Sequence, residues 1–77
     1  MKQLQSIKSE DLEFDVGKSY SIDIPNSEIK HVNAHILNII DDNKNIIIVF
    51  KYYSKYKRHW YYRAEELETL DIYNDKI

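Results

Sequence analysis

The chain has 77 residues and no cysteine, and its 13 aspartates and glutamates exceed its 11 lysines and arginines, which gives a net charge of −2. This length predicts one small domain, near the lower limit at which a hydrophobic core alone stabilises a fold. The lack of cysteine excludes disulfides and thiolate metal sites, and it favours a protein of the reducing cytoplasm. The acidic balance counts against generic duplex-DNA binding, and we expect neither a membrane span nor a signal peptide, because no apolar run is long enough.

Residues 1–15 are largely polar, and we expect them to form an N-terminal arm that precedes the main domain. Two structures are open for this arm. Ser9 stands before two acidic residues, as a helix N-cap does, which favours a short helix. Alternatively, an extended arm lays its apolar residues on the domain, where they would cover Ile47 and Val49. These apolar residues are Leu4, Ile7, Leu12 and Phe14.

Alternation of apolar and polar residues predicts two strands in the first half of the domain. Residues 18–24 alternate strictly, as a half-buried strand does, and turn-forming residues at 25–27 end the strand. A second strand is expected over residues 31–40. Its alternation slips by one position near Leu37 and Asn38, which predicts a β-bulge there.

The polar sequence DDNKN, residues 41–45, predicts a hairpin loop that leads into a third strand over residues 46–53. Phe50 and Tyr52 share one face of this strand, and Lys51 lies on the other. Burying an unpaired ammonium group is costly, so we expect the face that carries Lys51 to be the outer one.

The segment KYYSKYKRHWYYR, residues 51–63, is the most distinctive part of the chain. It holds six of the ten aromatic side chains and has a charge of +5 with no acidic residue, whereas the rest of the chain sums to −7. Cations mixed with aromatic rings suit phosphates and stacked bases, or an acidic patch on a partner. We therefore predict a binding surface here.

The length of the loop that joins the third strand to a fourth strand within this segment decides which of these side chains are exposed. An even number of loop residues would place His59 and Arg63 in the core. A five-residue loop over residues 54–58 keeps Arg63 outside, and we predict this loop, with Trp60 and Tyr62 in the core. The candidate binding residues are then Lys51, Tyr53, Lys55, Tyr56, Lys57, Arg58, His59, Tyr61 and Arg63.

The end of the chain completes a mainly β domain. The sequence AEEL, residues 64–67, suits a single 3₁₀ turn, and residues 68–73 form a short last strand. Five short strands with a 3₁₀ turn before the last resemble an SH3-like small barrel of the Tudor group over residues 16–73, with WYYRAEEL as the sharpest local likeness. An OB-like barrel is the nearest alternative, but we expect no helix between the third and fourth strands. We expect residues 74–77 to form a C-terminal tail.

The SH3-like resemblance implies a binding module, because such barrels host many functions. The acidic balance of the chain favours a protein partner, which would make the protein an interaction module or inhibitor. The alternative ligand is single-stranded or structured nucleic acid, bound through the same hairpin. An aromatic cage for a methylated side chain would use Tyr53 and Tyr61, but the neighbouring cations would repel such a ligand.

The chain is also similar in style to many small proteins of phages and mobile elements. Some of these proteins, including anti-CRISPR proteins, block host nucleic-acid enzymes. Acidic residues flank the basic segment, and if they share one face that face would mimic nucleic-acid phosphates in a partner's basic groove. These residues are Glu10, Asp11, Glu13, Asp15, Asp23, Glu65, Glu66, Glu68, Asp71 and Asp75.

Nothing in the sequence predicts catalysis, a cofactor or a metal. The chain has no glycine-rich phosphate loop and no nucleophile motif. His31 and His35 are four residues apart, which on a strand separates them by roughly 13 Å, too far for one metal ion. The oligomeric state is open between a monomer and a homodimer, since pairing of two copies would cover the outward Ile47 and Val49.

Overall fold

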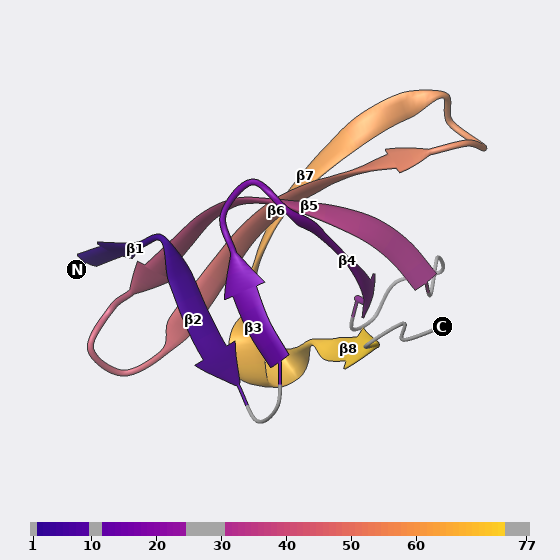
Figure 1. Cartoon of the computed structure of the whole chain (residues 1–77). Coiled ribbons are helices and arrows are strands. Elements are labelled where there is room, and N and C mark those ends of the chain that lie inside the picture. The colour runs from indigo at the N-terminus through magenta and orange to yellow at the C-terminus, as the bar shows by residue number, and fades with distance from the viewer. Residues whose placement is uncertain (1, 10–11, 25–30, 74–77) are drawn as a thin grey trace.

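We describe residues 2–9, 12–24 and 31–73 of a computed structural model, in which the chain is mainly β and its strands pair antiparallel (Figure 1). The turn expected at residues 25–27 and the tail at 74–77 lie outside the described residues. The elements are β1 (Lys2–Leu4), β2 (Ser6–Ser9), β3 (Leu12–Asp15), β4 (Ser19–Asp23), β5 (His31–Asp41), β6 (Ile46–Ser54), β7 (His59–Glu66), the 3₁₀ turn η1 (Leu67–Thr69) and β8 (Asp71–Tyr73).

The main sheet has the order β7-β6-β5-β4-β8, and β1 adds to β5. The strands predicted over residues 18–24, 31–40 and 46–53 are confirmed. The predicted loop between β5 and β6 is confirmed as well. In this loop Asn43 has a φ of 73°, and its backbone amide donates to Asp41 Oδ1 at 2.9 Å. Among the described strands, β7 and β8 stand at the two ends of this order and do not pair with each other, so the sheet is open rather than a closed barrel.

The β-bulge expected in the second half of β5 is confirmed. Ile36 lies opposite Phe50, but the next pair joins Asn38 to Val49, so Leu37 is the extra residue. The extra residue reverses the alternation, because successive side chains of a strand point to opposite faces. Ile36 and Ile39 therefore both face the core and are fully buried, although three positions separate them.

Within the N-terminal segment β2 and β3 form a β-hairpin, so the short helix, one of the two alternatives for this segment, is wrong. Strands β2 and β3 pair with each other, and Ile7 lies opposite Phe14. Phe14 is fully buried, and its ring meets that of Tyr20 edge to face with 4.7 Å between the ring centres. Leu4 and Ile7 pack against the same core. Leu4, Ile7 and Phe14 thus belong to the core or pack against it, and not, as expected, over Ile47 and Val49.

The turn between β3 and β4 joins the N-terminal hairpin to the main sheet. Gly17 has a φ of +93°, a conformation that side chains disfavour, and its amide donates to the Ile36 carbonyl at 2.8 Å. Lys18 binds the Asp15 carboxylate at 3.0 Å, and this hydrogen bond raises the pKa of the lysine. The turn therefore fixes the direction in which the chain enters β4.

The last strand, β8, lies beside β4, which comes much earlier in the chain. Strand β7 continues to Glu66, so the 3₁₀ turn η1 begins later than the sequence predicts. Leu70 follows the turn and is buried, and β8 then pairs with β4, with Ile72 opposite Ile22. No helix within the described ranges is both long and apolar enough to cross a membrane.

Candidate binding surface on the β6–β7 hairpin

The hairpin of β6 and β7 is closed by a loop of four residues, 55–58, so the predicted five-residue loop is wrong. Ser54 pairs with His59, Tyr53 with Trp60 and Tyr52 with Tyr61. Ser54 is buried and shapes the turn, because its carbonyl accepts from the Arg58 amide at 2.8 Å and its hydroxyl accepts from the Lys57 amide at 3.3 Å. Arg58 completes the turn in the left-handed region, with a φ of 57°.

The observed pairing exposes Trp60 and Tyr62, which the sequence assigned to the core. Trp60 is 47% exposed and Tyr62 is 66% exposed. They lie directly opposite Tyr53 and Lys51, and side chains of directly opposite residues share one face of a sheet. We call the surface formed by Lys51, Tyr53, Trp60 and Tyr62 the aromatic face. It points away from the core that contains Phe50.

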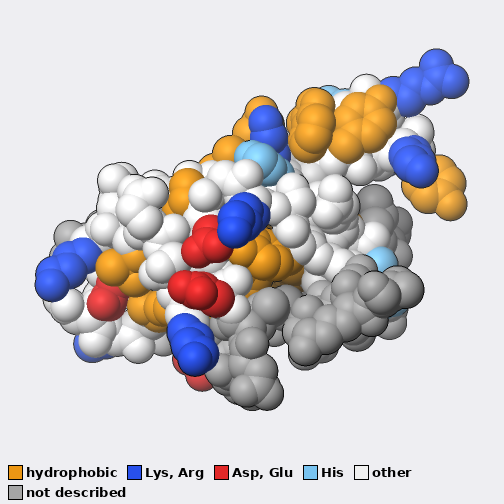
Figure 2. Space-filling view, in the orientation of Figure 1, with side chains coloured by type: hydrophobic (Ala, Val, Ile, Leu, Met, Phe, Trp, Pro, Cys, Tyr) orange, Lys and Arg blue, Asp and Glu red, His pale blue; other side chains and the backbone are white. Residues whose placement is uncertain are grey.

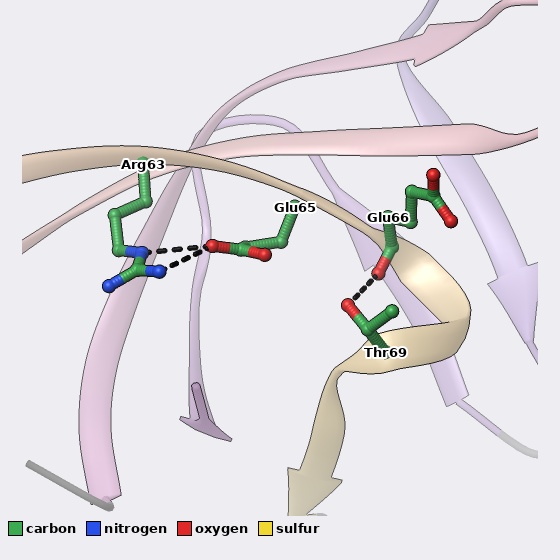
Figure 3. A network of polar contacts seen from close by, with 4 residues as sticks. All are labelled: Arg63, Glu65, Glu66 and Thr69. Atoms are coloured by element: carbon green, nitrogen blue, oxygen red, sulfur yellow. Dashed lines mark hydrogen bonds and ion pairs between the residues drawn. The ribbon is translucent and has the colours of Figure 1, made fainter. Parts of the chain in front are cut away.

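The other face of the hairpin carries Tyr61 and Arg63, which the sequence placed on the binding surface. The ring of Tyr61 stacks on that of Tyr52 at 5.6 Å, and Tyr61 packs against the core. Arg63 is tolerated on this face because Glu65, two residues further along the strand, accepts hydrogen bonds from its Nε and Nη2 at 3.0 and 2.7 Å (Figure 3). The hydrogen bond to Glu65 raises the pKa of Arg63.

The side chains of the aromatic face hold one another in place. Tyr53 and Trp60 meet edge to face, with 5.5 Å between the ring centres and 70° between the ring planes. The Lys51 ammonium lies 4.8 Å from the centre of the Trp60 ring. A cation over an indole ring is an attractive arrangement worth about 0.5–1 kcal/mol at an exposed site. The face is therefore partly ordered before any ligand binds.

The loop residues form a basic tip next to the aromatic face. All four are exposed, and Tyr56 is 91% exposed between two lysines. Figure 2 shows apolar side chains grouped on the β6–β7 hairpin, which projects from the body of the molecule, with basic side chains at its end. The basic tip consists of Lys55, Tyr56, Lys57 and Arg58.

Among the nine residues predicted to bind, Lys51 and Tyr53 therefore lie on the aromatic face, and the four loop residues form the tip. His59 is exposed but lies beside Tyr61, with 4.9 Å between the ring centres, on the face opposite Trp60. Trp60 and Tyr62 are surface residues that the sequence did not predict. The signal that would have exposed them is the Arg63-x-Glu65 spacing, because on a strand it places a partner on the same face as the arginine.

Several of the acidic residues considered as a phosphate-mimicking face are engaged locally. Asp15 binds Lys18, Asp23 lies 3.0 Å from His31 and Glu65 binds Arg63. Glu10, Asp11 and Asp75 lie outside the described residues. In the part of the chain that the structure describes, no three His, Asp or Glu side chains are placed to hold a metal ion.

No protein-family model matches this chain, and comparisons with curated proteins and with solved structures found no match.

Proposed function

We propose that the protein is a non-catalytic binding module that docks on an acidic surface of another protein through the aromatic face and the basic tip. The observation that carries the proposal is the combination on one projecting hairpin of four exposed rings and four cations. No acidic residue occurs between Lys51 and Ala64, so nothing within that stretch neutralises these cations. Arg63, the fifth cation of residues 51–63, does not belong to this surface. It lies on the opposite face of the hairpin, where Glu65 binds it.

The kind of side chain on the aromatic face supports a protein partner. Tryptophan, tyrosine and arginine are the residues most enriched where binding energy concentrates in protein interfaces. Tyr53 and Trp60 are each about half exposed and fix one another, so little side-chain entropy remains to be lost on binding. The net charge of −2 also weakens long-range attraction to a polyanion, while the basic tip still favours a local acidic patch.

Nucleic acid is a second candidate ligand, and the basic tip is the observation that favours it. Tyr56 is 91% exposed and stands between Lys55 and Lys57. An exposed ring flanked by ammonium groups is able to stack on a base while the lysines contact phosphates. In this case the affinity would fall steeply with salt, because each phosphate contact releases counterions.

A capture experiment with matched variants tests the proposal. The tagged protein is incubated with lysate, with and without nuclease, beside two charge-reversed variants. One variant changes the tip (Lys55→Glu, Lys57→Glu, Arg58→Glu), and the control changes three exposed lysines elsewhere (Lys2→Glu, Lys8→Glu, Lys44→Glu). The two variants alter the net charge equally, so only the location of the charge differs.

We expect one protein partner that survives nuclease treatment, is lost with the tip variant and is kept by the control variant. A third variant, Tyr53→Ser with Trp60→Ser, removes the ring pair and should also lose the partner. Loss of all captured material after nuclease would instead support nucleic acid. Equal capture by the tip variant and the control variant would refute a role for this hairpin.

We further infer that β4 to β8 follow an SH3-like plan. Two observations support this inference: β4, the first strand of the set, pairs with both β5 and the last strand β8, and a 3₁₀ turn stands before that last strand. Pairing of the first strand with the last curls the sheet toward itself, as small barrels require. On this plan the β6–β7 hairpin projects from the body, where a partner has access to it.

A further inference from the structure

The strands at the two ends of the order β7-β6-β5-β4-β8 differ in length and in protection. Strand β8 has three residues, and such short edges offer little to a second chain. Strand β7 has eight residues, and its pairing with β6 runs without a register shift. Among the described strands β7 pairs with β6 alone, so one side of its backbone has no partner strand. Its sequence, HWYYRAEE, contains no proline and no lysine, two of the devices that block pairing at an edge, and its inward charges, Arg63 and Glu65, are paired with each other.

The charges along β7 make the strand complementary to itself. The chain enters the strand from Arg58 and leaves it at Glu66, and both side chains are exposed. An antiparallel pair of identical strands places the start of one opposite the end of the other. Two copies joined at this edge therefore bring a cation of each to an anion of the other. The intramolecular pair of Arg63 and Glu65 adds no net charge that would repel the second copy.

We propose that β7 is a self-pairing edge through which two copies form a dimer, with the two-fold axis at Tyr62. A two-fold axis perpendicular to the sheet leaves the outer faces of both copies on the same side of the joined sheet. Because side chains of directly opposite residues share a face, such an axis must pass through a residue of β7 and not between two residues. An axis at Arg63 would set two arginines against each other. The axis at Tyr62 places Trp60 opposite Ala64, whose small side chain leaves room for the indole, and brings Glu66 at the end of one strand beside Arg58, the turn residue that precedes the strand of the other copy.

Dimerisation along β7 would also enlarge the binding surface. The aromatic faces of the two copies would become one continuous surface, with the two Tyr62 rings adjacent at its centre. The two basic tips would point in opposite directions from the axis. The dimer rests on the β7 edge alone and is measured with purified protein, so its failure would leave the proposed partner binding untouched.

Charge reversal across the seam tests the register. Sedimentation velocity over a range of protein concentrations would give the dimer dissociation constant of the wild type and of four variants. Glu66→Arg and Arg58→Glu each place like charges opposite each other twice per dimer, and each should weaken the dimer by about tenfold or more. The double variant restores opposite charges and should recover wild-type affinity. Glu68→Arg, at an exposed acid in η1 outside β7, should change nothing.

A cysteine at the axis provides an independent test, because the natural chain has none. Tyr62→Cys brings two thiols close enough to form an intermolecular disulfide under mild oxidation, whereas Ser19→Cys, on the exposed end of β4, should not do so. A wild-type protein that stays monomeric at high concentration would overturn the proposal. A dimer that is unaffected by both single reversals, or one that crosslinks equally through both cysteines, would also overturn it.

Discussion

Replacing Phe14 by alanine should destabilise the protein far more than the same change at Tyr62, although both residues are aromatic. Phe14 is fully buried and Tyr62 is 66% exposed. Buried aromatic side chains cover roughly 150–250 Å², and Phe→Ala changes in cores cost about 3–5 kcal/mol. Only about one third of Tyr62 is covered, which corresponds to about 1–2 kcal/mol. A domain of this length is stable by about 4–12 kcal/mol in total, so Phe14→Ala removes a large fraction.

Urea denaturation followed by circular dichroism and by the fluorescence of Trp60, the single tryptophan, measures both losses. If Phe14→Ala leaves too little folded protein, Phe14→Leu should still fold and lose about 1–2 kcal/mol. Equal losses for Phe14→Ala and Tyr62→Ala, or a loss at Phe14 below about 1 kcal/mol, would refute the reasoning. The N-terminal segment would then be an arm on the surface and not a part of the core.

Three further changes probe the backbone and the one charged pair of β7. Gly17→Ala should cost about 1–2 kcal/mol by thermal or urea unfolding, because the φ of +93° is strained for any side chain even though a Cβ atom would meet no neighbour within 4 Å; a loss near zero would contradict this. Arg58→Gly should stabilise the protein by about 0.5–1 kcal/mol, because glycine relieves the left-handed conformation at a φ of 57°; destabilisation would show that the guanidinium matters to the fold. A double-mutant cycle of Arg63→Ala and Glu65→Ala should give a coupling of about 0.5–1 kcal/mol that shrinks in high salt, since both side chains are partly exposed. Glu65 raises the pKa of Arg63, so the contribution of that guanidinium is lost only as the pH rises through the raised value, and the coupling should be equal at about pH 6 and pH 9.

Much of the main sheet could be predicted from the sequence because its residues alternate with the period of a strand. The bulge in β5 was visible for the same reason, since the alternation slips where Leu37 is inserted. The loop between β5 and β6 was predictable from turn chemistry, as Asp41 and Asn43 make a local hydrogen bond there. These features depend on neighbours in the sequence, which a single chain reveals.

The register of the β6–β7 hairpin could not be predicted in this way, because a shift of one residue reverses every side chain of the strand. An inward position of Arg63 was expected to be too costly, because burying an unpaired charge is unfavourable. The structure permits it, since Glu65 on the same face binds the guanidinium. The wrong register placed Tyr61 on the surface and Trp60 in the core, the reverse of what is observed. It left the residues of the basic tip unchanged. The N-terminal hairpin was missed because its strands are short and only long-range packing of Phe14 reveals their role.

The way in which β6 separates from β5 has a consequence for the motion of the binding hairpin. The last partner of β6 in β5 is His35, opposite Lys51, and beyond this pair β7 is the one strand that pairs with β6 in the described part of the chain. A two-stranded ribbon is only marginally stable in water, so the distal hairpin should open locally more often than the central strands. Amide hydrogen exchange should therefore be faster at Tyr53 and Trp60 than at Ile39 and Ile48. A partner that binds there would slow this exchange, and the hairpin is able to adjust its angle to the surface it meets.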